Sequence, residues 1–331
     1  MTSRVFYMSS PPAAQREIML SVQPPDFEAS FLETDDADEL RSKLLLADFI
    51  VAHQITADQI AIAERARLIQ GPGVGYEKID VDAAQRRGIP VAITPEGTVQ
   101  GVSEHTILLI LALYKHLTDA HTALKNGHWI HQQLRPICLM LEDKRVGIVG
   151  MGRIGREVAR RLQGWGVELV YADLRRLTAA EEEQYRATYL PLEELLASSD
   201  VVTLHVFLSE ASRHLIGERE LGLMKPEAVL INTSRGDVVD EAALYRALAE
   251  RRLYGAGIDA WSTEPTPPDN PLLRLDNVVV TPHMATANRD AMIKKSLATY
   301  ANFQRVLRGE APLNVVRPYH QVVADAAGSG G

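Results

Sequence analysis

The chain has 331 residues, of which 46% are hydrophobic and 24% are charged, and its formal net charge is −8 at pH 7. This length and composition are typical of a soluble globular protein with two domains and a sizeable core. The acidic balance and the lack of a basic stripe argue against nucleic acid as a partner. The single cysteine, Cys138, excludes an intrachain disulfide and a cysteine-cluster metal site, and we expect no bound metal.

The sequence predicts a cytoplasmic protein with no membrane partner. Its N-terminus lacks the apolar segment of a signal peptide. The longest apolar run covers residues 107–114, which is too short to cross a bilayer. A lone cysteine also fits a reducing compartment.

Short apolar runs alternate with helical patterns along the first 93 residues, which predicts an α/β domain. The expected strands cover residues 4–8, 44–51, 67–70 and 91–94. A glycine-rich loop at residues 71–75 interrupts the pattern, and flexible loops of this kind can offer backbone amides to an anion. A long, largely buried helix is expected over residues 101–126, and Gly127 would end it.

The middle of the chain carries its most informative motif. Residues 146–149 form a short apolar run, and Gly150, Gly152 and Gly155 follow it in the spacing G-x-G-x-x-G. A helical pattern with apolar residues on one face then begins at Ile154. In a strand–turn–helix of this kind, glycines let backbone amides approach a pyrophosphate at the helix N-terminus.

A second apolar run, residues 167–172, follows that helix and ends at Asp173. An acid about 20 residues past the glycines accepts hydrogen bonds from the adenosine ribose and repels a 2′-phosphate. The segment therefore predicts a dinucleotide site, the alternative being a glycine-rich turn in some other α/β protein. Asp173 favours NAD over NADP, although Arg175 and Arg176 lie close enough in sequence to approach a 2′-phosphate.

Strand–helix alternation continues after Asp173. Further strands are expected at residues 201–205, 229–232, 255–259 and 277–281, with helices between them such as residues 241–251. This alternation predicts a parallel, doubly wound sheet. A last helix over residues 288–307 precedes a tail, residues 322–331, whose composition is typical of disorder.

The expected fold class is α/β, with two Rossmann-like doubly wound domains. Because the dinucleotide motif begins near residue 145, the NAD-binding domain (residues 101–287) is expected to be inserted into a discontinuous substrate domain (residues 1–100 and 288–331). The default position for an active site in such a protein is between the two domains.

Three polar residues follow three successive predicted strands: Arg235, Glu264 and His283. The carboxyl ends of strands in an open α/β sheet border the ligand crevice. An arginine fork can clamp a carboxylate and polarise a carbonyl, although position alone leaves Arg235 open to a surface salt bridge. A histidine beside a carboxylate can transfer one proton near neutral pH, and hydride transfer from a nicotinamide needs little more.

Together these segments resemble the D-isomer-specific 2-hydroxyacid dehydrogenase family over about residues 45–315. The motifs that carry the resemblance are Gly73-Val-Gly-Tyr-Glu-Lys-Ile-Asp80, Gly150-Met-Gly-Arg-Ile-Gly155, Asn232-Thr-Ser-Arg-Gly236, Asp259-Ala-Trp-Ser-Thr-Glu-Pro265 and Thr281-Pro-His283. The resemblance implies an NAD-dependent oxidoreductase that interconverts a 2-oxo acid and a D-2-hydroxy acid. It also implies a homodimer that packs through the cofactor domain.

The resemblance implies roles for individual residues. The catalytic set is Arg235, Glu264 and His283, with His283 as the acid in reduction and the base in oxidation. The substrate carboxylate is bound by the amides of Val74 and Gly75 together with Arg235, and His283 also contacts the substrate. The implied cofactor contacts are Thr98, Gly150, Gly152, Arg153, Ile154, Gly155, Asp173, His205, Val206, Ser212, Thr233, Ser234, Arg235, Asp259, His283 and Ala285.

Some positions depart from the family pattern. Where the family has a His-x-Pro-Leu turn, this chain has His205-Val-Phe-Leu208, so the loop on the adenosine side of the cofactor is expected to differ. The family's usual Asp-Val-Phe is replaced by Asp259-Ala-Trp261. The glycines that usually follow the catalytic histidine are replaced by Ala285-Thr286. The pocket for the substrate side chain is expected around Met8, His53 and Gln54, and near Trp261 and Met284. A structural role is at least as plausible for His53, and packing is equally plausible for Trp261 and Met284.

Several alternatives remain within and beyond this family. Glyoxylate or hydroxypyruvate reductase, phosphoglycerate dehydrogenase and phosphite dehydrogenase share the catalytic set. A phosphoglycerate enzyme often carries an added regulatory domain, for which we expect no room after residue 315. Formate dehydrogenases carry glutamine where Glu264 stands, which argues against formate. An NAD-sensing corepressor of the same fold keeps the catalytic set and binds protein partners; the lack of long disordered or basic flanks argues against it.

Overall fold

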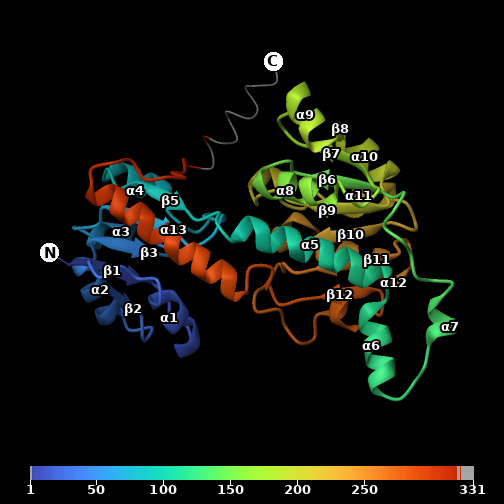
Figure 1. Cartoon of the computed structure of the whole chain (residues 1–331), viewed down its shortest axis with the longest axis horizontal. Coiled ribbons are helices and arrows are strands. Elements are labelled where there is room, and N and C mark those ends of the chain that lie inside the picture. Colours follow the sequence, from blue (N-terminus) through green and yellow to red (C-terminus); the bar gives the residue numbers. More distant parts are fainter. Residues whose placement is uncertain (1, 319–320, 322–331) are drawn as a thin grey trace. The chain divides into compact units, whose positions relative to one another are not determined.

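The computed structural model describes residues 2–318 and residue 321 of the chain. The chain divides into two compact units. One unit extends to Thr98 and resumes at Ala287, and the other runs from Val99 to Thr286. Each is built on a parallel β-sheet with helices packed against it (Figure 1). The predicted disordered tail, residues 322–331, lies outside the described residues.

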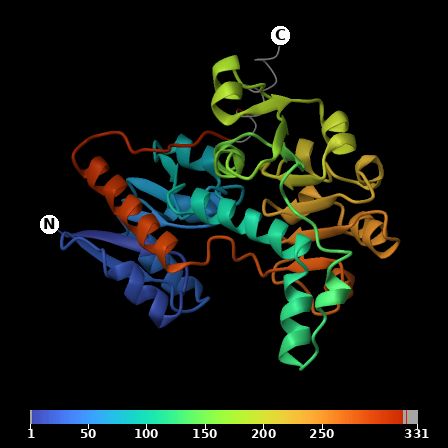
Figure 2. The same ribbon diagram turned by 45° about the vertical axis from the view of Figure 1, so that its right-hand side comes forward.

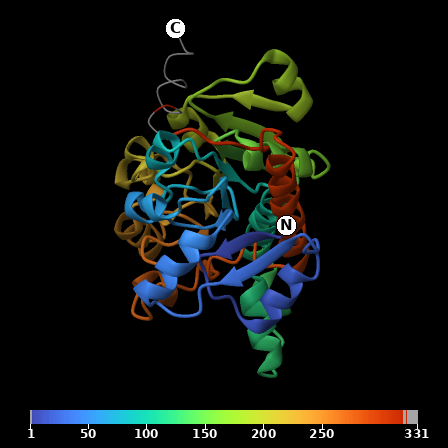
Figure 3. The ribbon, with the colours of Figure 1, turned by 90° about the vertical axis from the view of Figure 1, so that its left-hand side faces the viewer.

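The first unit contains a five-stranded parallel sheet in the order β2-β1-β3-β4-β5. Its strands are β1 (Ser3–Tyr7), β2 (Phe27–Phe31), β3 (Phe49–Val51), β4 (Leu68–Gly71) and β5 (Val91–Ile93). Its helices are α1 (Ala13–Leu20), α2 (Ala37–Leu46), α3 (Ala57–Ile62), α4 (Val81–Arg86) and α13 (Arg289–Leu307). Helix α13 returns to the N-terminal strands (Figure 3), where the Phe303 ring stacks on Phe49 at 4.4 Å between centroids. The chain's last long helix therefore completes the core of the unit that contains its first strands.

The second unit contains a seven-stranded parallel sheet in the order β12-β11-β10-β9-β6-β7-β8. Its strands are β6 (Arg145–Val149), β7 (Glu168–Ala172), β8 (Ala187–Tyr189), β9 (Val201–Leu204), β10 (Val229–Asn232), β11 (Gly255–Ile258) and β12 (Val278–Val280). The strand order reverses direction at β6, between β7 and β9. In an open α/β sheet, ligands bind at the carboxyl ends of the strands beside such a reversal.

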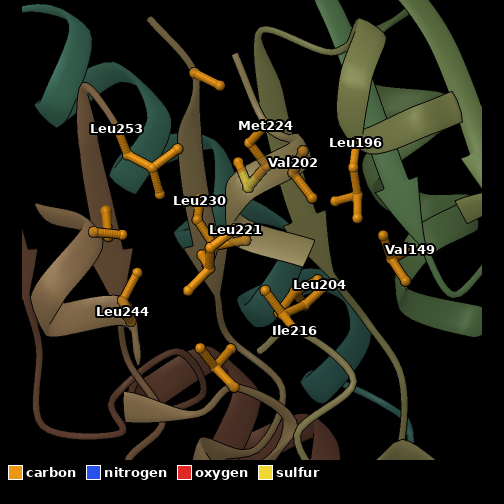
Figure 4. Close-up of a cluster of buried hydrophobic side chains, with 14 of the residues drawn as sticks. Val149, Leu196, Val202, Leu204, Ile216, Leu221, Met224, Leu230, Leu244 and Leu253 are labelled. Atoms are coloured by element: carbon orange, nitrogen blue, oxygen red, sulfur yellow. The ribbon is translucent and has the colours of Figure 1, made fainter. Parts of the chain in front are cut away.

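The second unit also contains helices. They are α5 (Thr98–Tyr114), α6 (Leu117–Lys125), α7 (His131–Leu134), α8 (Arg153–Leu162), α9 (Ala179–Tyr185), α10 (Leu192–Ser198), α11 (Glu218–Leu223) and α12 (Glu241–Ala249), with short 3₁₀ turns η1 (Glu210–Ser212), η2 (Gly236–Val238) and η3 (Pro271–Arg274). Figure 4 shows one buried cluster, in which Leu204 and Leu230 of the sheet meet Ile216, Leu221 and Leu244. Burying side chains of this size contributes about 1.5–3 kcal/mol each.

The structure confirms the predicted α/β class and the parallel doubly wound sheet, and it corrects two predicted elements. Residues 44–46, expected to begin a strand, instead end α2, whose first turn is capped by the Asp36 side chain. A continuous apolar run cannot by itself separate the buried end of a helix from the strand that follows it. The single helix expected over residues 101–126 is two helices, because His116 adopts a left-handed conformation with φ 47°.

Two further features bear on the function classes considered. Among the described residues, none of the helices combines the length and apolar character needed to traverse a bilayer. In the same part of the chain, no three His, Cys, Asp or Glu side chains are grouped so that they could hold a metal ion.

Candidate active site

The glycine motif forms the turn between β6 and α8. Gly150 has φ 95°, and a Cβ there would lie 2.8 Å from the His205 backbone. A Cβ at Gly155 would lie 2.1 Å from the Gly150 carbonyl oxygen, so both positions require glycine. A Cβ at Gly152, the N-cap of α8, would meet nothing within 4 Å. The helix N-terminus therefore opens onto free space, and this cradle fits a pyrophosphate.

Asp173 directly follows β7 and lies beside this turn. Its carboxylate accepts hydrogen bonds from the backbone N–H of Met151 at 2.6 Å and of Arg175 at 3.0 Å. The Arg176 guanidinium instead pairs with Glu182 at 3.0 Å. A carboxylate fixed at the end of the second strand is suitably placed for ribose hydroxyls.

The loop after β9 supports the glycine turn from the other side. The His205 N–H donates to the Val149 carbonyl at 2.7 Å, and its Nε2 lies 2.9 Å from the Thr203 hydroxyl. Its Nδ1 is buried without a hydrogen-bond partner among the described residues, and burial lowers the His205 pKa to about 3. The ring is therefore neutral near pH 7. Further along this loop, the Ser212 hydroxyl donates to the Phe207 carbonyl at 2.7 Å.

Arg235 lies in a tight loop after β10. The Asn232 side chain organises the loop, since its oxygen accepts from the Ser234 N–H and hydroxyl and its amide donates to the Arg235 carbonyl. The guanidinium donates to the Ser234 carbonyl at 2.7 Å. A Cβ on the next residue, Gly236, would lie 1.9 Å from the Trp261 carbonyl carbon. The loop that carries Arg235 is therefore packed directly on the backbone that leads to Glu264.

Glu264 and His283 form an ion-pair geometry. The His283 Nδ1 lies 2.8 Å and 2.9 Å from the two Glu264 carboxylate oxygens. One of these oxygens also accepts the Trp261 backbone N–H at 3.0 Å. Since the carboxylate is an acceptor, Nδ1 carries a hydrogen and Nε2 is the nitrogen left to exchange a proton. Both side chains are partly exposed.

Asp259, at the end of β11, holds the segment that follows His283. Its carboxylate accepts from the backbone N–H of Met284 at 2.8 Å and of Ala285 at 3.0 Å, and from the Thr281 hydroxyl at 2.6 Å. Burial by itself would raise the Asp259 pKa. The hydrogen bonds from His105, Thr281 and the two backbone amides outweigh it and lower the pKa to about 2.

The lowered pKa makes a prediction about acid stability. Because the folded state favours the ionised carboxylate, the stabilisation is complete above pH 4 and is lost as the pH falls from about 4 to about 2. We expect the wild type to melt at a higher temperature than Asp259→Asn at pH 6, and this gap to close between pH 4 and pH 2. Thermal unfolding followed by circular dichroism measures both, and a gap that does not change with pH would contradict the ionised network.

The remaining predicted contacts divide between the two units. Val74 and Gly75 lie in the first unit, in the loop after β4, and Thr98 ends that unit as the first residue of α5. The others belong to the second unit: Arg153 and Ile154 open α8, Val206 follows His205, Thr233 precedes Ser234, and Ala285 is buried beside Asp259. Trp261 is buried, which fits the packing role left open for it, and its indole N–H donates to the Thr281 carbonyl at 3.0 Å.

Sequence reasoning gave no role to two residues of this site, although Thr281 stands in one of the quoted motifs. Thr281 and His105 complete the Asp259 network, and His105 comes from α5, 176 positions before Thr281. Nothing in the local pattern of α5 distinguishes His105 from the other histidines. Only the tertiary fold brings the two segments together.

Arg235, Glu264 and His283 follow β10, β11 and β12, which are neighbours in the sheet. The second unit therefore brings an arginine, a carboxylate-paired histidine and a dinucleotide cradle to the carboxyl ends of one parallel sheet. This combination defines a nicotinamide-dinucleotide-dependent oxidoreductase.

Comparison with known proteins gives the family. Residues 107–285 match the model described as D-isomer specific 2-hydroxyacid dehydrogenase, NAD binding domain. A glyoxylate reductase from Korarchaeum cryptofilum is 40% identical over 296 residues, covering 88% of this chain and 86% of that protein. A D-3-phosphoglycerate dehydrogenase from Methanocaldococcus jannaschii is 36% identical, covering 84% of this chain and 53% of that protein. The solved structure of an acyclic imino acid reductase in complex with NADPH and D-Arg has a TM-score of 0.81 at 28% identity, covering 95% of this chain and all of that one.

The chain belongs to the D-isomer-specific 2-hydroxyacid dehydrogenase family. It is an enzyme that interconverts 2-oxo acids and D-2-hydroxy acids with a nicotinamide cofactor. The family expected from the motifs is thus confirmed.

Proposed function

We propose that the enzyme reduces a small 2-oxo acid, with glyoxylate or hydroxypyruvate as the first candidates, and that it uses NADH. The observation that carries the proposal is the His283–Glu264 pair, 2.8 Å apart, at the strand end next to the Arg235 loop. The glyoxylate reductase that is 40% identical to this chain supports a small substrate.

In the proposed reaction His283 is the proton donor. Its Nδ1 donates to Glu264, which fixes the orientation of the ring, and its Nε2 delivers the proton to the carbonyl oxygen. The nicotinamide, when bound, supplies the hydride. We assign Arg235 to the substrate carboxylate and carbonyl, and the backbone amides of Val74 and Gly75 to the carboxylate. In the direction of oxidation His283 accepts the proton.

The preference for NAD rests on Asp173. Its carboxylate is fixed against the glycine turn by the Met151 N–H, so it cannot easily move away from a 2′-phosphate. Asp173→Asn removes the charge and keeps an oxygen that can accept this hydrogen bond. We expect the variant to raise the KM for NADH roughly 10-fold and to lower the KM for NADPH by a similar factor. Steady-state kinetics with both cofactors measure this, and a wild type that prefers NADPH would contradict the assignment.

We propose that the enzyme is a homodimer. Helices α6 and α7 extend away from the sheet of their unit (Figure 2). The segment that contains them exposes several large apolar side chains, namely Leu117, Leu124, Trp129, Ile137 and Met140, with Trp129 77% exposed. Exposed apolar groups at this density are typical of a protein interface. Light scattering coupled to size exclusion tests the assembly, and a monomeric mass would contradict it.

We also propose a cytoplasmic location. Cys138 is a free, half-buried thiol, which fits a reducing compartment. Fractionation of the native cells with a cytoplasmic marker enzyme tests it.

The activity is tested by following NADH oxidation against a panel of 2-oxo acids: glyoxylate, hydroxypyruvate, pyruvate, 2-oxoisocaproate and phenylpyruvate. Turnover that is fastest with glyoxylate and hydroxypyruvate supports the proposed substrate class. A preference for phenylpyruvate would contradict the small-substrate part of the proposal. No turnover on any of them, with NADH still bound in a fluorescence titration, would contradict the 2-oxo acid reaction.

A further inference from the structure

Helix α5 carries a buried histidine that the predicted catalytic set does not use. His105 is 7% exposed, and its Nε2 lies 2.9 Å from the Thr281 hydroxyl and 3.4 Å from an Asp259 carboxylate oxygen. Burying a polar side chain costs free energy of desolvation unless the side chain forms hydrogen bonds in the folded protein. Here the partners belong to the two strand ends that precede Glu264 and His283.

The donors and acceptors fix the direction of these hydrogen bonds. The Thr281 hydroxyl donates to Asp259 at 2.6 Å, so its oxygen accepts from His105. The Asp259 carboxylate only accepts, because its lowered pKa keeps it ionised. The His105 Nε2 therefore carries a hydrogen and donates into the network.

This network reaches the backbone on both sides of the proton donor. Asp259 accepts the His283 N–H on its own carbonyl at 2.9 Å and the Met284 and Ala285 N–H groups on its carboxylate. His283 itself has φ 49°, a left-handed conformation that a residue other than glycine keeps only where neighbouring contacts hold it. The loop from Thr281 to Ala285 is thus held in an uncommon conformation by a chain of hydrogen bonds that begins at the His105 side chain.

The same network also reaches Glu264. The Thr281 carbonyl accepts the Trp261 indole N–H at 3.0 Å, and the Trp261 backbone N–H donates to the Glu264 carboxylate. Next to His105, the Thr106 hydroxyl lies 3.0 Å from that of Thr233, in the loop that carries Arg235. One turn of α5 therefore contacts the loops of all three proposed catalytic residues.

We propose that His105 is a positioning residue: by donating from Nε2 to Thr281 it holds the Thr281–Ala285 loop so that His283 faces Glu264. The proposal rests on the role of His283 given above. A histidine that only filled space in the core could be replaced by an apolar side chain of similar size with little effect on the reaction. A positioning residue could be replaced only by another donor at the same place.

Two substitutions separate these cases. His105→Gln keeps an N–H donor near the position of Nε2, whereas His105→Leu removes it. We expect H105L to lower kcat on the order of 10-fold to 100-fold, because small displacements of a catalytic group are costly, with the KM for the 2-oxo acid and for NADH changed less than about 3-fold. H105Q should stay within about 3-fold of the wild type in kcat.

Ser103→Ala is the matched control. Ser103 is fully buried in the same helix, but its hydroxyl donates within that helix, to the Gln100 carbonyl. We expect S103A to leave kcat unchanged. Equal losses in H105L and H105Q, or a kcat for H105L within 3-fold of the wild type, would overturn the proposal. If H105L does not fold, His105→Asn takes its place, since its shorter amide remains polar but does not reach Thr281.

A second readout does not depend on the activity. With ¹⁵N-labelled tryptophan, the Trp261 indole resonance, assigned with W261F, reports its hydrogen bond to the Thr281 carbonyl. We expect this resonance to move in H105L and to stay in place in H105Q and S103A. If the wild type turned over no 2-oxo acid, the proposed function would be wrong. The Trp261 resonance would still test the role of His105, because it does not depend on turnover. An unmoved resonance in H105L would overturn that role by itself.

Discussion

Replacing His283 with alanine should lower kcat for 2-oxo acid reduction by roughly 10²-fold to 10⁴-fold, the range that general acid catalysis contributes. The variant removes the proton donor that Glu264 holds at 2.8 Å and leaves the glycine turn between β6 and α8 untouched. NADH should therefore bind within about 3-fold of its wild-type affinity, measured by fluorescence titration. A kcat within 10-fold of the wild type would remove His283 from the mechanism.

Glu264→Gln is the companion variant. It keeps a hydrogen-bond acceptor for the His283 Nδ1 and removes the negative charge. Because a charged acceptor holds the Nδ1 hydrogen more strongly than a neutral amide oxygen does, kcat for 2-oxo acid reduction should be lower in E264Q than in the wild type. A kcat equal to that of the wild type would show that the Glu264 charge contributes nothing to the reaction.

Replacing Gly236 with alanine should have the largest effect on stability. The added Cβ would lie 1.9 Å from the Trp261 carbonyl carbon and 2.0 Å from the Ser262 nitrogen, and neither is the end of a flexible side chain. The Arg235 loop and the segment leading to Glu264 must therefore separate. We expect a loss of about 4 kcal/mol or more in the free energy of unfolding, or no folded protein. Denaturant unfolding measures it.

Gly222→Ala is the matched control for this substitution. Gly222 lies in α11, and a Cβ there would meet nothing within 4 Å. Alanine has the higher helix propensity, so G222A should be neutral or more stable by about 0.5–1 kcal/mol. A G236A variant as stable as G222A would contradict the close contact between the two loops.

Local chemistry accounts for the part of the site that could be predicted from the sequence. The strand–turn–helix could be predicted because two of its positions require glycine. Gly150 has φ 95°, and Gly155 lies against the Gly150 carbonyl. Asp173 was predictable because it follows a buried strand at a fixed distance from these glycines. The order of strands then placed Arg235, Glu264 and His283 at neighbouring strand ends.

Features set by long-range contacts could not be predicted. The break between α5 and α6 falls at His116, where neither proline nor glycine marks it; its ring instead bonds Asp119 and the Tyr254 hydroxyl. His105 could not be predicted because its hydrogen-bond partner, Thr281, lies far along the chain. The hydrogen bond from the Trp261 indole N–H to the Thr281 carbonyl likewise depends on the tertiary fold.

The configuration of the product tests the central claim most directly. A prochiral 2-oxo acid from the panel, such as hydroxypyruvate or pyruvate, would be reduced with NADH and the 2-hydroxy acid resolved by chiral chromatography. We predict that the wild type forms the D enantiomer. Over the same time, H283A should form at least 10²-fold less of it. An L product, a racemic one, or equal yields from the two proteins would contradict a D-specific enzyme in which His283 donates the proton.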